Sequence, residues 1–132
     1  MRQEILNLNL PKDSFIVVGS GILDALGIRD SNDIDMIVSQ EDFELLGRSG
    51  WEQGTWFDQV TFKKGMFDVG THWMGKKLEG LIKNASTIDD VPYLSLDDLL
   101  VWKCKKSRPI DLLDVDLILA YKNNLKILKC DY

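Results

Sequence analysis

A short buried strand that runs directly into glycine is the feature that most limits what this chain can fold into. Residues 15–18 read Phe-Ile-Val-Val, an apolar run typical of a buried strand, and Gly19-Ser20-Gly21 ends it. Ile22, Leu23 and Leu26 then follow at helical spacing. The pattern predicts a strand, a tight turn and a short helix. Free N–H groups at a helix start that follows small residues favour a phosphate, and the Ser20 hydroxyl can add a donor.

Two carboxylates stand at the head of the next apolar segment. Asp33 and Asp35 are separated by one residue, and the run from Ile34 to Val38 predicts a second strand. Because side chains alternate along a strand, both carboxylates are expected on one face. Adjacent carboxylates repel each other unless a cation lies between them, and Mg²⁺ accepts both carboxylate and phosphate oxygens. The sequence therefore predicts a site for Mg²⁺ or Mn²⁺.

These two motifs resemble a known family. Val18-Gly19-Ser20 and Asp33-Ile34-Asp35-Met36 are similar to the motifs of the DNA polymerase β-like nucleotidyltransferases, in the small bacterial branch that includes antibiotic nucleotidyltransferases and toxin-type enzymes. The resemblance implies an α/β (α+β) nucleotidyltransferase fold, with a small mixed sheet flanked by helices and a helical C-terminal part. It also implies that an NMP is transferred from an NTP such as ATP to a hydroxyl acceptor, with release of pyrophosphate.

A third acidic residue follows on a later apolar segment. Asp68 lies between Phe67 and Val69, so alternation turns its carboxylate away from both apolar neighbours. The resemblance implies that such a residue joins Asp33 and Asp35 as a catalytic and metal-binding group, which binds the metal at the acceptor or accepts the acceptor's proton. A solvated residue on an edge strand is the alternative.

The C-terminal part carries a second block similar to the same family. Its pattern is Lys103, then Arg108, then Asp111 and Asp114 on two expected helices. The resemblance implies that Lys103 and Arg108 bind the triphosphate, as Gly19 and Ser20 do at the first motif. The alternative is an ion-pair cluster that holds the two helices together, and for Asp114 this alternative is the preferred interpretation.

Other signals give the remaining elements. Residues 2–10 are compatible with a helix or a strand, and a short helix that ends before Pro11 is preferred. We also expect a helix from Ser39, a β-hairpin over residues 51–71, a helix over residues 75–84, a loop over residues 87–92, and helices beginning near Ser95 and Pro109. The indole of Trp56 is expected to be a core or interface aromatic, and His72 to serve packing.

Length and charge limit the class of protein. A chain of 132 residues fits one domain, predicted as a single nucleotidyltransferase-like domain over residues 1–132. The net charge of −5 argues against binding to long nucleic acid, although clusters such as Lys63-Lys64 could meet nucleotide phosphates. The lack of a long apolar run or signal-peptide pattern predicts a cytoplasmic protein without membrane association. Cys104 and Cys130 lie far apart, which supports neither a disulfide framework nor a zinc site.

Two functions therefore remain open. The first is metal-dependent nucleotidyl transfer, with a small molecule, a protein side chain or a tRNA end as acceptor. The second is a nucleotide-binding or regulatory module without turnover that acts with a partner protein. The small size indicates that an added domain, a homodimer or a partner subunit would have to complete an acceptor pocket. A phosphatase or glycosyltransferase site is disfavoured, because in those sites the apolar strand precedes the acidic pair.

Overall fold

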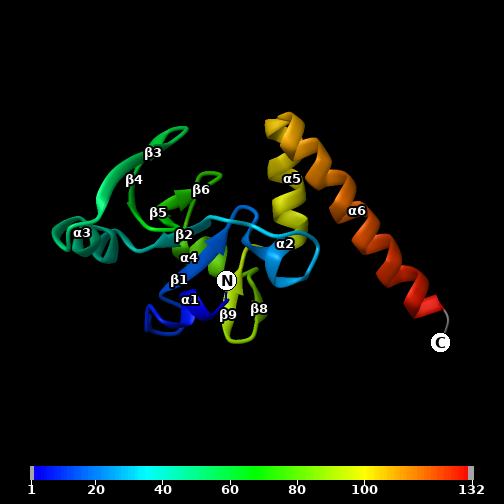
Figure 1. The fold of residues 1–132 in the computed structure, drawn as a ribbon, viewed down its shortest axis with the longest axis horizontal. Helices are drawn as coiled ribbons and strands as arrows, with labels where there is room; N and C mark the ends of the chain where they lie inside the picture. The colour runs from blue at the N-terminus through cyan, green and yellow to red at the C-terminus, as the bar shows by residue number, and fades with distance from the viewer. Residues whose placement is uncertain (1, 131–132) are drawn as a thin grey trace. The chain divides into compact units, whose positions relative to one another are not determined.

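The structure is a computed structural model, and it describes residues 2–130, with the side chains of residues 3–125. The chain divides into two compact units. Residues 1–95, here called the sheet unit, carry the strands, and residues 96–132, here called the helical unit, carry two helices (Figure 1). The predicted mixture of a mixed sheet, flanking helices and a helical C-terminal part is confirmed. That one domain spans residues 1–132 stays a prediction.

The sheet unit contains a mixed sheet. Within the described residues it has seven strands, in the order β3-β4-β5-β2-β1-β9-β8 (Figure 1). Neighbouring strands are antiparallel except for two pairs, β2 with β5 and β1 with β9, which are parallel. The strands are β1 (Phe15–Val18), β2 (Ile34–Val38), β3 (Glu52–Trp56), β4 (Gln59–Lys64), β5 (Phe67–Gly70), β8 (Ser86–Ile88) and β9 (Val91–Tyr93). Strands β1 and β2, both predicted from the sequence, lie side by side at its centre.

Apolar side chains on these central strands form a large part of the core. Fully buried residues include Ile16, Val18, Ile34, Met36 and Ile37. Four helices of the sheet unit are α1 (Arg2–Leu6), α2 (Gly21–Ala25), α3 (Gln40–Arg48) and α4 (Leu78–Ile82). The predicted start of α3 is confirmed, because the Ser39 side chain accepts a hydrogen bond from the backbone N–H of Asp42. The core thus fixes the strand ends that carry the acidic residues.

The predicted loop over residues 87–92 is wrong. Strands β8 and β9 form an antiparallel hairpin there, and β9 also pairs with β1. The turn residues Asp89 and Asp90 have φ angles of 51° and 67°, which a tight hairpin turn requires. Glycine and asparagine are the usual residues in such a turn, so an Asp-Asp pair hid the hairpin from the sequence pattern.

Two further predictions were incomplete. Residues 51–71 were expected to form one hairpin, but they contribute three strands, because Phe57 and Asp58 make an additional turn between β3 and β4. The helix expected over residues 75–84 is only α4, and a small ribbon of β6 (His72–Trp73) and β7 (Lys76–Lys77) precedes it. Neither new turn carries an Asn-Gly or Asp-Gly pair, the strongest hairpin signal.

The helical unit consists of α5 (Leu96–Lys106) and α6 (Pro109–Cys130). Pro109 begins α6 as predicted, since a proline at the first helical position lacks an N–H that would be unpaired there. Across residues 2–130, no helix combines the length and the apolar character needed to cross a membrane.

Candidate functional site in the sheet unit

The turn after β1 lies against the carboxylate of Asp35. Gly19 has a φ angle of +64°, and a Cβ added there would lie 3.0 Å from Oδ2 of Asp35. Glycine is favoured at position 19 for two reasons: the backbone angle is one that other residues rarely adopt, and a side chain would crowd the Asp35 carboxylate. The two halves of the motif, separated in the sequence, meet at this contact.

Arg29 brings a positive charge to the same turn. Its Nη2 donates a hydrogen bond of 3.0 Å to Oγ of Ser20, and its Nη1 donates to the backbone carbonyl of Asp30. The hydroxyl of Ser20 does not cap α2 through a side-chain hydrogen bond. Since this hydroxyl accepts from Arg29, its own proton can still be donated to a ligand. Gly19, Ser20 and Arg29 thus provide a small residue, a donor and a cation at one place.

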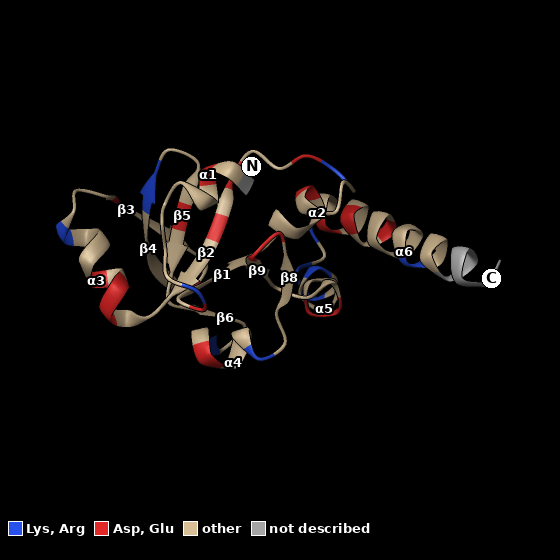
Figure 2. Ribbon diagram, turned by 90° about the horizontal axis from the view of Figure 1, so that it is seen from below, with Lys and Arg blue, Asp and Glu red and all other residues tan. Residues whose placement is uncertain are grey.

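Asp35 and Asp68 are direct neighbours across two parallel strands. Asp35 of β2 is in register with Asp68 of β5. Adjacent strands lie about 4.8 Å apart and cross-strand partners project from the same face, so the two carboxylates stand side by side. Acidic segments on both β2 and β5 are visible in red in Figure 2. Two carboxylates this close repel each other, and a divalent cation bound between them would compensate that repulsion.

The two oxygens of Asp68 have different surroundings. Oδ2 accepts a hydrogen bond of 2.8 Å from Nε1 of Trp56 and lies 3.4 Å from Nζ of Lys63. Oδ1 is buried and has no hydrogen-bond partner among the described residues. A buried oxygen of this kind costs free energy unless something binds it. A bound cation would satisfy Oδ1, so this oxygen fits the role of a metal ligand.

Asp33 differs from the other two acids. It is exposed and lies one residue before β2, and its backbone carbonyl accepts a hydrogen bond from Oγ of Ser31. Among the described residues, no cluster of three or more His, Cys, Asp or Glu side chains is arranged to hold a metal ion. Mg²⁺ is commonly bound by one or two carboxylates together with substrate phosphates and water, rather than by a complete protein cage. The structure brings Asp35 and Asp68 together, and metal binding by Asp33, Asp35 and Asp68 stays a prediction.

Lys103 and Arg108, the predicted triphosphate ligands of the helical unit, contact carboxylates of the same unit. Nζ of Lys103 lies 2.7 Å from Asp114 and 3.5 Å from Asp111, and the Lys103 side chain is only 3% exposed. Arg108 binds Asp111 through two nitrogens, at 2.6 and 3.0 Å. The ion-pair cluster expected as the alternative is therefore present, and triphosphate binding by these two cations stays a prediction.

This cluster lowers the pKa of Asp111. Burial alone would raise its pKa, but the hydrogen bonds from Arg108 and the charge of Lys103 outweigh burial and lower the pKa below its usual value. The hydrogen bond to Asp111 raises the pKa of Arg108. Asp111 also accepts a hydrogen bond from the backbone N–H of Arg108, and this hydrogen bond caps the start of α6. The cluster joins α5 to α6.

Three residues near the acidic pair were not assigned to the site from the sequence. Arg29 lies in the segment between the two motifs and carries no signal of its own, Trp56 is expected from the sequence to be a core or interface aromatic, and Lys63 belongs only to a basic cluster. The basic character of β4 is visible in blue in Figure 2. Strand pairing brings Trp56 and Lys63 to Asp68, and pairing register cannot be read from β3 and β4 individually.

Comparison with known proteins gives no relative for this chain: no family model, curated protein or solved structure matches it.

Proposed function

We propose that this protein is a metal-dependent nucleotidyltransferase of the DNA polymerase β-like type, which transfers an NMP from an NTP to a hydroxyl acceptor. The observation that carries the proposal is the surroundings of Asp35, which has the carboxylate of Asp68 on one side and the turn at Gly19 on the other. A phosphate at this turn would lie beside two neighbouring carboxylates that can share a divalent cation with it. That combination is the requirement of phosphoryl-transfer chemistry, which depends on positioning and charge neutralisation.

In this proposal, different residues of the sheet unit bind the triphosphate and the metal ion. Gly19 lets the triphosphate approach the backbone, while Ser20 and Arg29 provide a hydrogen bond and a positive charge. Asp35 and Oδ1 of Asp68 would hold Mg²⁺ or Mn²⁺. When bound, the ion supplies charge neutralisation at the phosphates and stabilises the attacking and leaving oxygens.

The reaction forms one bond and breaks one. The acceptor hydroxyl oxygen bonds to the α-phosphorus of the NTP, and the bond from the α-phosphorus to the bridging α–β oxygen breaks. Pyrophosphate leaves with that oxygen, and the hydroxyl proton passes to water or to a carboxylate of the site. The protein's part is to align the hydroxyl with the leaving oxygen and to compensate the negative charge of the phosphates.

Substitution of Gly19 tests the phosphate end. Gly19→Val should nearly abolish NTP binding, because the new side chain would meet the Asp35 carboxylate on a backbone with a φ angle of +64°. Ser20→Ala should weaken binding only modestly, since it removes one hydrogen bond. Equilibrium binding of a fluorescent ATP analogue measures both effects.

Gly27→Val is the matched control for Gly19→Val. Gly27 also has a positive φ angle, of +73°, but a Cβ added there would contact nothing within 4 Å. It should cost a similar backbone strain of about 1–3 kcal/mol and leave NTP binding intact. Equal NTP affinity in the native protein and in Gly19→Val would contradict the proposed phosphate site.

The acceptor is identified by labelling. The protein is incubated with Mg²⁺ and each α-³²P-labelled NTP in a cell extract, which is then separated into small molecules, RNA and protein. Label in one fraction, dependent on Mg²⁺ and lost in Asp35→Asn, is the expected result and names the acceptor class. Label in no fraction with any NTP would favour the nucleotide-binding module without turnover.

A further inference from the structure

A row of four charged side chains crosses the sheet through the carboxylate pair. Glu52 of β3 is opposite Lys63 of β4, Lys63 is opposite Asp68 of β5, and Asp68 is opposite Asp35 of β2. Because cross-strand partners project from the same face, these four residues, here called the charged row, share one face of the sheet. Lys63 is the single positive charge of the row and stands between two carboxylates.

Lys63 and Trp56 both contact the same oxygen of Asp68. The indole N–H of Trp56 donates to Oδ2 at 2.8 Å, and the ammonium group of Lys63 lies 3.4 Å from it. The Asp68 side chain is 12% exposed, whereas that of Lys63 is 53% exposed. The hydrogen bond from Trp56 fixes the rotation of the carboxylate and so orients Oδ1, the buried oxygen without a hydrogen-bond partner among the described residues, while Lys63 places a positive charge beside it.

Two glycines make room for these partners. A Cβ added at Gly54 would lie 2.8 Å from Cε of Lys63, and one added at Gly70 would lie 2.8 Å from Cζ3 of Trp56. Larger residues at either position would displace the Lys63 stem or the Trp56 ring. Trp56 also makes an edge-to-face contact with Trp73, with ring centroids 5.7 Å apart. The arrangement around Oδ2 is therefore supported by Gly54 of β3, Gly70 of β5 and Trp73 of β6.

We propose that Trp56 is a positioning residue whose hydrogen bond holds Oδ2 of Asp68 and directs Oδ1 toward the divalent ion, and that the charge of Lys63 limits how tightly the site binds that ion alone. This inference rests on the proposed function. The ammonium group of Lys63 repels a divalent cation but attracts the triphosphate that accompanies it. The charge of Lys63 therefore favours loading of the ion together with a nucleotide over loading of the bare ion.

Substitutions of Lys63 and Trp56 should have opposite effects on binding of Mn²⁺ alone. Lys63→Met removes the competing charge and should tighten Mn²⁺ binding about tenfold, since each tenfold change needs only about 1.4 kcal/mol of electrostatic interaction. Trp56→Phe removes an orienting hydrogen bond and should weaken binding about tenfold. The electron paramagnetic resonance signal of free Mn²⁺ measures both dissociation constants at fixed ionic strength.

Each variant has a matched control. Lys64→Met removes the same charge from the next residue, which pairs with Phe67 and projects from the opposite face, and should leave Mn²⁺ affinity near native. Trp51→Phe replaces a tryptophan that contacts Phe67 and should also be neutral. Lys63→Arg keeps the charge and should restore native affinity. Melting temperatures establish that each variant folds.

The outcomes separate this inference from the function on which it rests. Opposite shifts in Lys63→Met and Trp56→Phe, with neutral controls, are the expected result. If Asp35→Asn abolishes Mn²⁺ binding while the Lys63 and Trp56 variants match the native protein or shift in the same direction, the positioning role is wrong and the metal site stands. If neither the native protein nor Lys63→Met binds Mn²⁺, the proposed function fails together with the inference.

Discussion

Replacement of Asp35 by asparagine is expected to reduce nucleotidyl transfer by about a thousandfold or more and to leave the metal-free protein at least as stable as the native one. Asp35 stands beside Asp68 and against Gly19, so in the proposed reaction it would contribute to both the metal end and the phosphate end of the site. Loss of a metal ligand removes several kcal/mol of transition-state stabilisation, and about 1.4 kcal/mol corresponds to tenfold in rate. Neutralising one of two adjacent carboxylates also relieves their repulsion.

Two measurements check the expected result for Asp35→Asn. Mg²⁺ should raise the melting temperature of the native protein, because an ion that binds only the folded state stabilises it, and Asp35→Asn should lose that shift. Asp58→Asn, a change of the same kind at an exposed carboxylate, should keep both the shift and the activity. Transfer at a near-native rate by Asp35→Asn would contradict the assigned role. Asp33→Asn, measured alongside, determines whether the exposed Asp33 belongs to the site.

Replacement of Lys103 by methionine should produce a large loss of stability. Lys103 is buried and contacts the carboxylates of Asp111 and Asp114, so its removal leaves their negative charge poorly compensated. Breaking a buried ion pair from one side typically costs about 3–5 kcal/mol. For a protein of this size the melting temperature should fall by about 10–20 °C. Thermal unfolding followed by circular dichroism measures the change.

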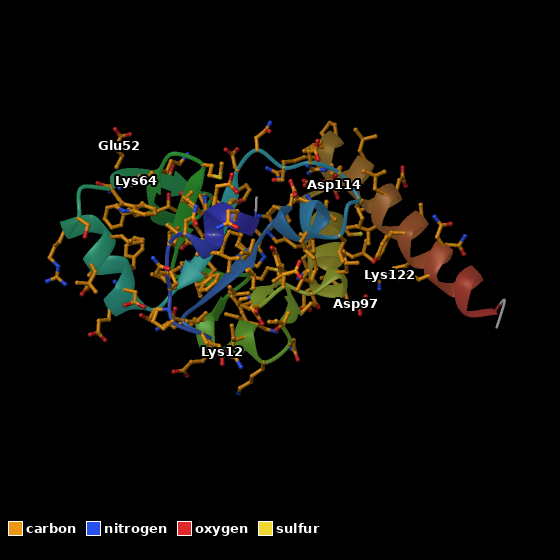
Figure 3. All side chains as sticks on the ribbon, turned by 60° about the horizontal axis from the view of Figure 1, so that its bottom comes forward. Lys12, Glu52, Lys64, Asp97, Asp114 and Lys122 are labelled. Carbon is orange, nitrogen blue, oxygen red and sulfur yellow. The ribbon has the colours of Figure 1, made fainter. Side chains whose placement is uncertain are left out.

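Lys122→Met is the matched control for Lys103→Met. Lys122 pairs with Asp97 between the same two helices, and both residues are labelled in Figure 3. The Asp97 side chain is 79% exposed, and ion pairs at such sites contribute about 0–1 kcal/mol. The control should therefore unfold within a few degrees of the native protein. Equal effects of the two substitutions would show that burial of the Lys103 cluster has no special role.

Asp114→Ala tests whether the cluster is structural or catalytic. If its carboxylate serves to pair with Lys103, the substitution should lower the melting temperature more than it lowers turnover. The comparison is made well below the melting temperature of the variant, so that the folded fraction is the same. Lost turnover with an unchanged melting temperature would move Asp114 into the catalytic group.

Acid should weaken the same cluster. The pKa of Asp111 is lowered in the folded protein, so its carboxylate stabilises the fold above the pKa of the unfolded chain, about 3.9, and loses this effect as pH falls through the lower folded pKa. The stabilisation by the Asp111 carboxylate is therefore fully present at neutral pH, and it is lost only at pH below about 4. Denaturant unfolding at pH 7 and pH 3 should show a smaller acid loss in Asp111→Asn than in the native protein.

The central strand-turn-helix-strand segment could be predicted from the sequence because each of its signals is local. The apolar run at residues 15–18, the glycine after it and the capping serine before α3 all act within a few residues. The β8–β9 hairpin could not be predicted, because Asp89 and Asp90 adopt positive φ angles that are more typical of glycine and asparagine.

The carboxylates of the site could be named from the sequence, but their surroundings could not. Asp35 and Asp68 follow from a spacing and from alternation along a strand. That Asp68 meets Trp56 and Lys63 depends on the register of three strands, and a shift of one residue would have turned these side chains to the other face. Arg29 meets Ser20 only because the segment after α2 folds back on the turn.

The position of the label in the NTP tests the central claim most directly. Parallel reactions with Mg²⁺ and the acceptor fraction use an NTP labelled with ³²P at either the α- or the γ-phosphorus. Nucleotidyl transfer predicts that α-label becomes attached to the acceptor, that γ-label is released as pyrophosphate, and that Asp35→Asn does neither. Transfer of γ-label to the acceptor, or no Mg²⁺-dependent reaction from either position with any NTP, would contradict the proposed function.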